Sequence, residues 1–169
     1  MTATVSGGRL EPAEGLRYNH HCSVVEIGGF GILIEGASGS GKTSLALGLL
    51  DACRFRGIPG VLIADDQAFL MEDANGLRAD APESIRGKAE VRGYGVVNRP
   101  SRESATIHLV VRLVEDRLVE RMPEDKSLTR IGRLALLQPV PVQNLPQRHE
   151  AQGIRIVMAV LENRFGLAS

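Results

Sequence analysis

Eight consecutive residues could bind the phosphates of a nucleotide. Their spacing is G-x-x-x-x-G-K-[ST], and the run is Gly36, Ala37, Ser38, Gly39, Ser40, Gly41, Lys42 and Thr43. Glycines let successive backbone N–H groups converge on phosphate oxygens, and the helix that follows adds the positive end of its dipole. In this pattern Lys42 bridges the β- and γ-phosphates and the Thr43 hydroxyl binds Mg²⁺. We therefore expect ATP and Mg²⁺ to bind here, rather than a Gly-rich turn that binds nothing.

A pair of acidic residues is the second feature with chemical potential. Asp65 and Asp66 end a short apolar run about twenty residues after Lys42. In α/β sheets the carboxyl ends of parallel strands meet at the ligand crevice, so an aspartate there can hold Mg²⁺ or accept a proton from a substrate. The simpler alternatives are a solvated loop or a helix cap. The sequence lacks the N-K-x-D motif with which GTPases recognise guanine, which weakens a GTPase interpretation.

The segments around these residues predict the strand, loop and helix that a phosphate loop requires. Phe30–Glu35 is an apolar run of strand length, and a helical pattern starts at Lys42 and meets no breaker before Gly57. Val61–Ala64 then predicts the short strand that delivers the two aspartates. Both conditions for accepting the phosphate-loop motif are therefore met in the sequence.

The rest of the chain predicts an α/β fold with a β-rich second half. We expect strands at 23–27, 69–72, 77–79, 106–113 and 134–137, tight turns at 28–29 and 73–76, one or two helical turns within 114–122, and extended chain at 139–142. Periodicity alone leaves 153–165 open between helix and strand. Residues 1–16 are expected to be disordered, and 17–169 to form a single domain.

Composition excludes several classes of protein. The 169 residues carry 20 basic and 20 acidic side chains, so net charge predicts no binding to nucleic acid or membranes. Aromatic residues make up 4%, too few for base-stacking platforms. No apolar run is long enough to cross a membrane. Cys22 and Cys53 lack metal spacing and read as reduced thiols, which favours a cytoplasmic protein.

Three motifs in order resemble the HPr kinase/phosphorylase family. They are the phosphate loop, the strand end Ile63-Ala64-Asp65-Asp66-Gln67, and the run Glu90-Val91-Arg92-Gly93-Tyr94-Gly95-Val96-Val97. The last run is the most discriminating, since a generic P-loop protein has no reason to contain it. The resemblance extends from about Asn19 to Phe165. It implies a P-loop kinase core, similar to the phosphoenolpyruvate carboxykinase type, with a β-rich sheet and flanking helices.

The resemblance also implies an activity. Such an enzyme transfers the γ-phosphoryl group of ATP to a serine of HPr, or of a nitrogen-branch paralogue of HPr, and so regulates carbon and nitrogen metabolism. It also removes that phosphate by attack of inorganic phosphate, which releases pyrophosphate. The alternatives are a P-loop kinase for a small metabolite, or a nucleotide-binding regulatory module that lacks turnover.

The family motifs imply roles for individual residues. Asp65 would accept the serine proton, His21 and Lys42 would act beside it, and Thr43 and Glu90 would bind the metal with Asp66 nearby. Further residues are matched less directly: Arg121 to stabilise phosphate charge, Arg92, Gly93 and Gly95 as the active-site signature, and Arg102 as a substrate contact. Simpler alternatives are a metal site at His20-His21-Cys22, a cross-strand ion pair between Glu90 and Arg92 on one face of a strand, and solvated surface arginines.

The sequence also departs from the longer family members. Only about twenty residues precede His21, which resembles the short form of α-proteobacteria without the separate N-terminal domain. The segment 139–152 corresponds to the loop used in dephosphorylation. Pro146 and Arg148 fit that loop, but Glu150-Ala151-Gln152 replaces its Gly-Arg-Asn. The resemblance further implies a homo-oligomer, a hexamer in the family.

Overall fold

The computed structural model describes residues 17–168, so the expectation for residues 1–16 lies outside the described residues. The chain forms, in order, β1 (Tyr18–His20), β2 (Cys22–Ile27), β3 (Phe30–Gly36), α1 (Lys42–Phe55), β4 (Gly60–Ala64), β5 (Ala68–Asp73), β6 (Gly76–Asp80), the 3-10 helix η1 (Glu83–Ile85), β7 (Lys88–Val91), β8 (Gly95–Asn98), β9 (Ser104–Val114), the 3-10 helix η2 (Asp116–Leu118), β10 (Lys126–Ile131), β11 (Leu134–Pro146) and α2 (Glu150–Arg164). The predicted α/β class, with a β-rich sheet and flanking helices, is confirmed.

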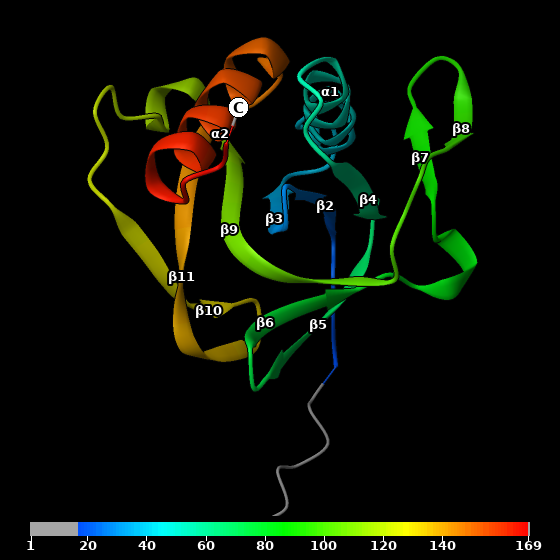
Figure 1. Ribbon diagram of the computed structural model, residues 1–169. Coiled ribbons are helices and arrows are strands. Elements are labelled where there is room, and N and C mark those ends of the chain that lie inside the picture. Colours follow the sequence, from blue (N-terminus) through cyan, green and yellow to red (C-terminus); the bar gives the residue numbers. More distant parts are fainter. Residues whose placement is uncertain (1–16, 169) are drawn as a thin grey trace, which may run out of the picture.

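One curled sheet carries most of the strands. Seven strands pair in the order β1-β5-β6-β9-β3-β2-β4, while β11 pairs with both β9 and β10. The strands β7 and β8 form a separate hairpin at the right of Figure 1, and α1 and α2 lie side by side on one face of the sheet. In the described residues no helix is long and apolar enough to span a membrane.

Four strands end at the same edge of this sheet. β9 is parallel to both β3 and β11, and β2 is antiparallel to both β3 and β4, so β4 runs in the same direction as β3. The carboxyl ends of β3, β4, β9 and β11 therefore come together. In α/β proteins this edge is where ligands bind.

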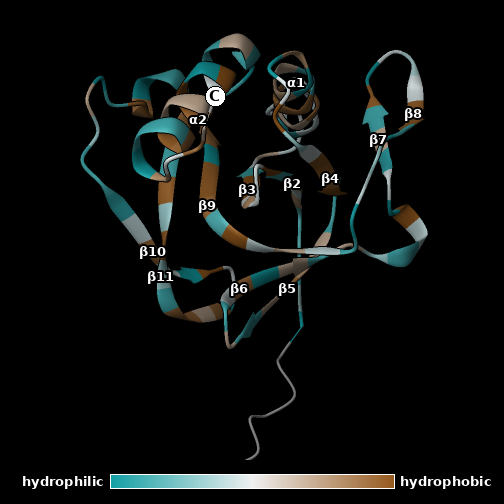
Figure 2. Ribbon diagram, in the orientation of Figure 1, coloured by the Kyte–Doolittle hydropathy of each residue, from teal (hydrophilic) through white to brown (hydrophobic). Residues whose placement is uncertain are grey.

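Two hydrophobic layers hold the sheet in place. Side chains alternate along β3, so Ile32 and Ile34 pack against the helices. Leu33 points to the other face of the sheet and packs in a second layer with residues of β5, β6, β10 and β11. Leu45 of α1 and Val157 of α2 complete the helix layer. Figure 2 shows β9 as strongly hydrophobic beside the helices, whereas α2 mixes hydrophilic and hydrophobic residues, as expected for a helix with one buried face.

The turn predicted at 28–29 and the helix end predicted at Gly57 are both confirmed, and both depend on glycine. Gly28 and Gly29 adopt φ of 56° and 88° between β2 and β3, and Gly57 adopts a φ of 69° just after α1. These left-handed conformations favour glycine because it has no Cβ. The expected hairpin at 73–76 is also present, joining β5 and β6.

Several predictions needed correction. Only η2 forms within 114–122, because Val114 still belongs to β9 and pairs with Pro146. β11 continues through the prolines at 139–142, where Val140 and Val142 pair with β10, a strand that carried no sequence prediction. The segment 153–165, left open between helix and strand, is helical as part of α2, which ends at Arg164. Glu90 and Arg92 do not share a strand face, since β7 ends at Val91 and Arg92 lies in the turn that follows.

Candidate active site around the phosphate loop

The phosphate loop connects β3 to α1, as its motif predicts. Gly39 and Gly41 adopt φ of 74° and 101°, and Gly41 precedes α1 without any side-chain cap. The first N–H groups of α1 are therefore free to bind an anion. At Gly36 a Cβ atom would lie 2.7 Å from Ser40 Oγ and 3.1 Å from the Leu113 carbonyl oxygen, so the loop starts in close contact with β9.

Two side chains of the loop fit a bound phosphate. Lys42 Nζ donates hydrogen bonds to the carbonyl oxygens of Gly36 and Ala37, both at 3.0 Å. Burial lowers the pKa of this ammonium group, although the nearby carboxylates of Asp66 and Asp65 oppose the effect. Ser40 is 1% exposed and, among the described residues, its Oγ has no hydrogen-bond partner. A phosphate oxygen would provide the missing acceptor.

Asp65 is a buried carboxylate held by three donors. The hydroxyls of Ser23 and Thr43 donate to its Oδ1 at 2.7 and 2.8 Å, and the backbone N–H of Glu90 donates to its Oδ2 at 3.2 Å. Its exposure is only 5%. The carboxylate thus links the phosphate loop, β2 and β7 in one hydrogen-bonded cluster. Ser23 was not predicted from sequence, because a serine on the inward face of a strand has no distinctive pattern.

Asp66 differs sharply from its neighbour. Its backbone has a φ of 72°, and its Oδ1 lies 3.1 Å from Nε2 of His21. The side chain of Asp66 is 70% exposed and that of His21 is 50% exposed. The Cys22 backbone N–H donates to the Asp66 carbonyl oxygen at 3.3 Å, which ties the two segments together. Asp66 and His21 therefore form an accessible acid–base pair.

A cavity of about 350 Å³ gathers the titratable groups of the site. We call it the Lys42 cavity; its walls include His21, Ser23, Lys42, Thr43, Asp66 and Glu90. The structure thus brings the predicted histidine, lysine, threonine, second aspartate and glutamate to one place. Arg92 also lines this cavity, and Gly93 and Gly95, with φ of 87° and 125°, form the turn between β7 and β8.

The donors around the Lys42 cavity suit Mg²⁺. Within residues 17–168, no three His, Cys, Asp or Glu side chains gather closely enough to bind a metal alone. Magnesium usually takes one or two carboxylates, waters and substrate phosphates. The Thr43 hydroxyl and the carboxylates of Asp65, Asp66 and Glu90 are hard oxygen ligands of this kind, so the residues present fit the ion.

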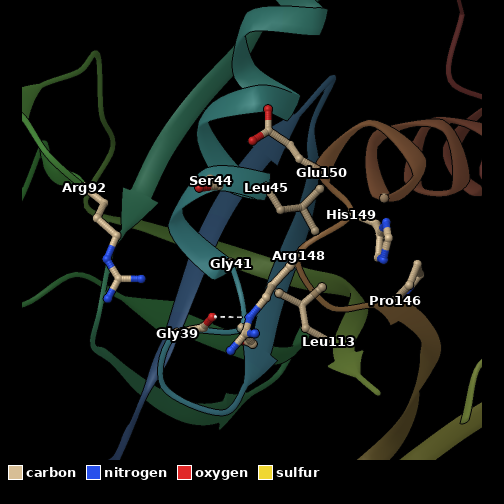
Figure 3. Close-up of a pocket in the computed structure, with 12 residues that line it drawn as sticks. Gly39, Gly41, Ser44, Leu45, Arg92, Leu113, Pro146, Arg148, His149 and Glu150 are labelled. Carbon is tan, nitrogen blue, oxygen red and sulfur yellow. Dashed lines mark hydrogen bonds between the residues drawn. The ribbon is translucent and has the colours of Figure 1, made fainter. Parts of the chain in front are cut away.

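The turn between β11 and α2 packs on the phosphate loop. Arg148 adopts a φ of 61°, its backbone N–H donates to the Ser40 carbonyl oxygen at 3.0 Å, and its Nε donates to the Gly39 carbonyl oxygen at 3.4 Å. Figure 3 shows the Arg148 side chain lying along the loop, with Pro146 and His149 beside it. The segment predicted to take part in dephosphorylation is therefore in contact with the phosphate loop.

Two predicted residues lie elsewhere. Arg102 Nη1 donates to Glu26 Oε1 at 2.5 Å. Arg121 lines a cavity with residues of α2 such as Ile156, and it is not among the residues that line the Lys42 cavity. The η2 turn is linked to the site instead, because Asp116 pairs with His149 at 2.9 Å. Arg117 on the same turn is largely exposed and pairs with Glu115, as expected for a solvated surface arginine.

Comparisons with known proteins agree with this geometry. The family described as "HPr Serine kinase C-terminal domain" matches residues 15–152. A protein named HPr kinase/phosphorylase from Clostridium novyi (strain NT) is 34% identical over 158 residues, which cover 87% of this chain and 48% of that protein. Another of the same name from Lacticaseibacillus casei (strain BL23) is 31% identical over 162 residues, which cover 88% of this chain and 47% of that protein. The chain spans about half the length of these relatives.

A solved structure supports the same fold. The Hpr(Ser) kinase/phosphatase from Coxiella burnetii has a TM-score of 0.70 to this chain at 21% identity, and the match covers 88% of this chain and 90% of that one. At this identity the likeness concerns the fold alone. The family match over residues 15–152 covers most of the sequence. The chain therefore belongs to the family of the HPr serine kinase C-terminal domain.

Proposed function

We propose that this chain transfers the γ-phosphoryl group of ATP to a serine hydroxyl of HPr, or of a nitrogen-branch paralogue of HPr. The main support is the Lys42 cavity, where the phosphate loop faces the accessible pair of His21 and Asp66. The relatives that span this chain carry the name HPr kinase/phosphorylase. A phosphate-binding loop opposite a solvent-accessible base is the arrangement that phosphoryl transfer to a hydroxyl requires.

The geometry favours roles for Asp65 and Asp66 that differ from those predicted from the sequence. Asp65 was expected to be the base, but it is buried and already accepts three hydrogen bonds. Asp66 is exposed and has His21 as its only ion-pair partner among the described residues. We therefore assign the proton transfer to Asp66, with His21 orienting its carboxylate, and assign Asp65 to holding the Thr43 hydroxyl.

In the forward reaction, Asp66 accepts the proton as the serine Oγ attacks the γ-phosphorus. The new bond joins the serine Oγ to that phosphorus, and the bond between the phosphorus and the β,γ-bridging oxygen breaks, so ADP leaves. The loop N–H groups and the Lys42 ammonium stabilise the charge on the transferred group. When bound, Mg²⁺ would neutralise phosphate charge, and Thr43 and Glu90 are the residues that would hold it.

The reverse reaction uses the same residues in the opposite order. An oxygen of inorganic phosphate attacks the phosphoserine phosphorus and the bond to the serine Oγ breaks, while Asp66 takes the proton from the attacking phosphate and passes it to the serine Oγ. The products are serine and pyrophosphate. Arg148, which lies along the phosphate loop, is suited to hold the incoming phosphate because its guanidinium carries a permanent positive charge.

We also propose that the chain acts as a homo-oligomer. Several large apolar side chains are unusually exposed: Phe55 at 90%, Met122 at 87%, Leu137 at 84% and Tyr94 at 80%. Single exposed apolar side chains are common on protein surfaces, so the proposal rests on the family resemblance, and these four are candidates for the contacts. Light scattering after size exclusion would measure the mass directly, and a monomeric mass at micromolar concentration would contradict this proposal.

The activity can be tested with purified components. The protein is incubated with ATP, Mg²⁺ and HPr, and intact-mass spectrometry then follows the gain of one phosphoryl group on HPr, with tandem spectra locating the serine. Inorganic phosphate is added next, and pyrophosphate is measured. A Lys42→Ala protein serves as the control. Absence of transfer to HPr and to its nitrogen-branch paralogue would overturn the proposal, and nucleotide binding without transfer would favour a regulatory module.

A further inference from the structure

A second cavity, of about 270 Å³, borders the phosphate loop, and Arg148 is part of its lining. We call it the His149 cavity. It shares Gly39, Gly41, Ser44 and Arg92 with the Lys42 cavity, but neither His21 nor Asp66 lines it. Its remaining walls come from the first turns of α1 and α2 and from the ends of β9 and β11. A ligand held by its phosphates on the loop can therefore extend from one cavity into the other.

The walls of the His149 cavity combine apolar and polar side chains. Leu45, Leu113 and Pro146 supply apolar surface, and Figure 3 shows Leu45 and Leu113 at its centre, with Pro146 and His149 to one side. Arg92, Arg148 and Glu150 are the charged side chains of its lining. An apolar pocket with a few polar groups is typical of small-molecule sites.

The imidazole of His149 is held in place by an ion pair. Its Nε2 lies 2.9 Å from Oδ2 of Asp116 on η2. His149 also precedes α2, where its carbonyl oxygen accepts the Gly153 N–H at 2.9 Å. The ring therefore has one side-chain partner and lies next to Pro146, where it can stack against another planar ring.

Gly153 lets α2 pack closely against α1 beside this cavity. A Cβ atom at this position would lie 3.0 Å from Cδ1 of Leu45, so α2 approaches α1 more closely than any larger residue would comfortably allow. The cavity falls just below the roughly 300–1,000 Å³ of pockets that enclose a complete ligand. Its size therefore suits one part of a nucleotide whose phosphates lie elsewhere.

From these observations we propose that the His149 cavity binds the adenosine part of ATP, with the base against His149 and Pro146 between the first turns of α1 and α2. The inference rests on the proposed function, because it places the remaining half of the same nucleotide. It assigns a binding role to His149, which the motif analysis did not select. Lys42, Thr43 and Asp66 do not line this cavity.

The first experiment compares ATP with inorganic tripolyphosphate, which has the phosphates but no nucleoside. Calorimetry with Mg²⁺ gives both dissociation constants for the wild type, His149→Ala, His149→Phe and Gln152→Ala. Gln152 lies on the same first turn of α2 but does not line the His149 cavity. We expect His149→Ala to weaken ATP binding about tenfold relative to tripolyphosphate, since ring stacking on a base contributes roughly 1–3 kcal/mol. His149→Phe keeps a ring and should preserve the ratio, as should Gln152→Ala.

The second experiment locates the base directly. Irradiation of the wild-type protein with 8-azido-ATP, followed by trypsin and mass spectrometry, should label peptides from 43–54, 134–148 or 149–155. Labelling confined to the β7–β8 hairpin, or an unchanged ATP to tripolyphosphate ratio in His149→Ala, would overturn this inference while leaving phosphate binding intact. If neither ATP nor tripolyphosphate bound, the proposed function itself would fail.

Discussion

The imidazole Nε2 of His20 lies 2.9 Å from Oε2 of Glu35, the residue that immediately precedes the phosphate loop. Arg112 on β9 donates to the other carboxylate oxygen. Both His20 and Glu35 are largely buried. Because neighbouring residues in extended chain point in opposite directions, holding His20 inward turns His21 outward toward Asp66. Glu35 thus positions the acid–base pair without touching substrate.

Replacing Glu35 with glutamine should cost stability in a pH-dependent way. Burial would raise the pKa of this carboxyl, but the hydrogen bonds from His20 and Arg112 outweigh it and hold the pKa below its ordinary value. The charged carboxylate therefore stabilises the fold above its unfolded pKa of about 4.3, and that contribution is lost as the pH falls through the lower folded value.

Urea unfolding at several pH values measures this effect. We expect Glu35→Gln to lower the free energy of unfolding by about 1–3 kcal/mol near pH 7, with the difference shrinking below about pH 4. Glu83→Gln, at an exposed position on η1, should show no such trend. A loss of equal size at every pH would contradict an electrostatic role for Glu35.

The two aspartates should respond differently to the same substitution. Asp66→Asn removes the proposed base and should lower the transfer rate about 10²–10⁴-fold with little change in the dissociation constant for ATP. Asp65→Asn removes an acceptor for the hydroxyls of Ser23 and Thr43, so it should weaken ATP binding in the presence of Mg²⁺ as well as transfer. Single-turnover transfer and calorimetry separate the effects. Near-normal transfer by Asp66→Asn would return the role of base to Asp65.

Lys42→Met should abolish nucleotide binding without lowering the stability of the free protein. Burial lowers the pKa of Lys42, so the charged form is less favourable in the folded chain than in water. An apolar side chain of similar length should therefore leave the melting temperature equal or higher, while the increase that ATP and Mg²⁺ produce should disappear. Thermal unfolding with and without nucleotide tests both statements. Retained stabilisation by ATP would argue against a phosphate contact for Lys42.

Arg148→Gly should affect the reverse reaction more than the forward one. Its φ of 61° suits glycine, so the turn should keep its shape, while the guanidinium proposed to hold inorganic phosphate is lost. We expect the Michaelis constant for inorganic phosphate in pyrophosphate release to rise about tenfold or more, with a smaller change in serine phosphorylation. Arg148→Lys, which keeps the charge, should lie between the two. If Arg148→Gly lowered serine phosphorylation and pyrophosphate release equally, Arg148 would be needed for the shape of the phosphate loop and not for binding inorganic phosphate.

The parts of the site that are contiguous in sequence were predictable. The run from Gly36 to Thr43 carries its own backbone requirements, and the apolar segments beside it specify the strand and the helix. The sequence predicted different roles for Asp65 and Asp66, but it did not predict which carboxylate is buried, since that depends on the left-handed backbone at Asp66.

Long-range contacts explain the remaining differences. Arg112 and Glu35 are 77 residues apart and meet only because β9 pairs with β3. The contact between Arg148 and the phosphate loop likewise depends on β11 lying parallel to β9. Arg121 was selected by motif position, but the turn that reaches the site is η2, whose Asp116 pairs with His149. Such pairings follow from sheet order, which local patterns do not determine.

The common direction of β3, β4, β9 and β11 has a consequence for how this chain tolerates change. All the residues assigned to chemistry follow the carboxyl ends of strands or lie on the β7–β8 hairpin, whereas the opposite edge carries connections such as the Gly28-Gly29 turn. Glu35 and Asp65 lie at the first edge and are hydrogen-bonded to other elements of the fold, so a change there alters stability together with activity. The opposite edge carries no residue assigned to chemistry, so a change there should act on stability alone.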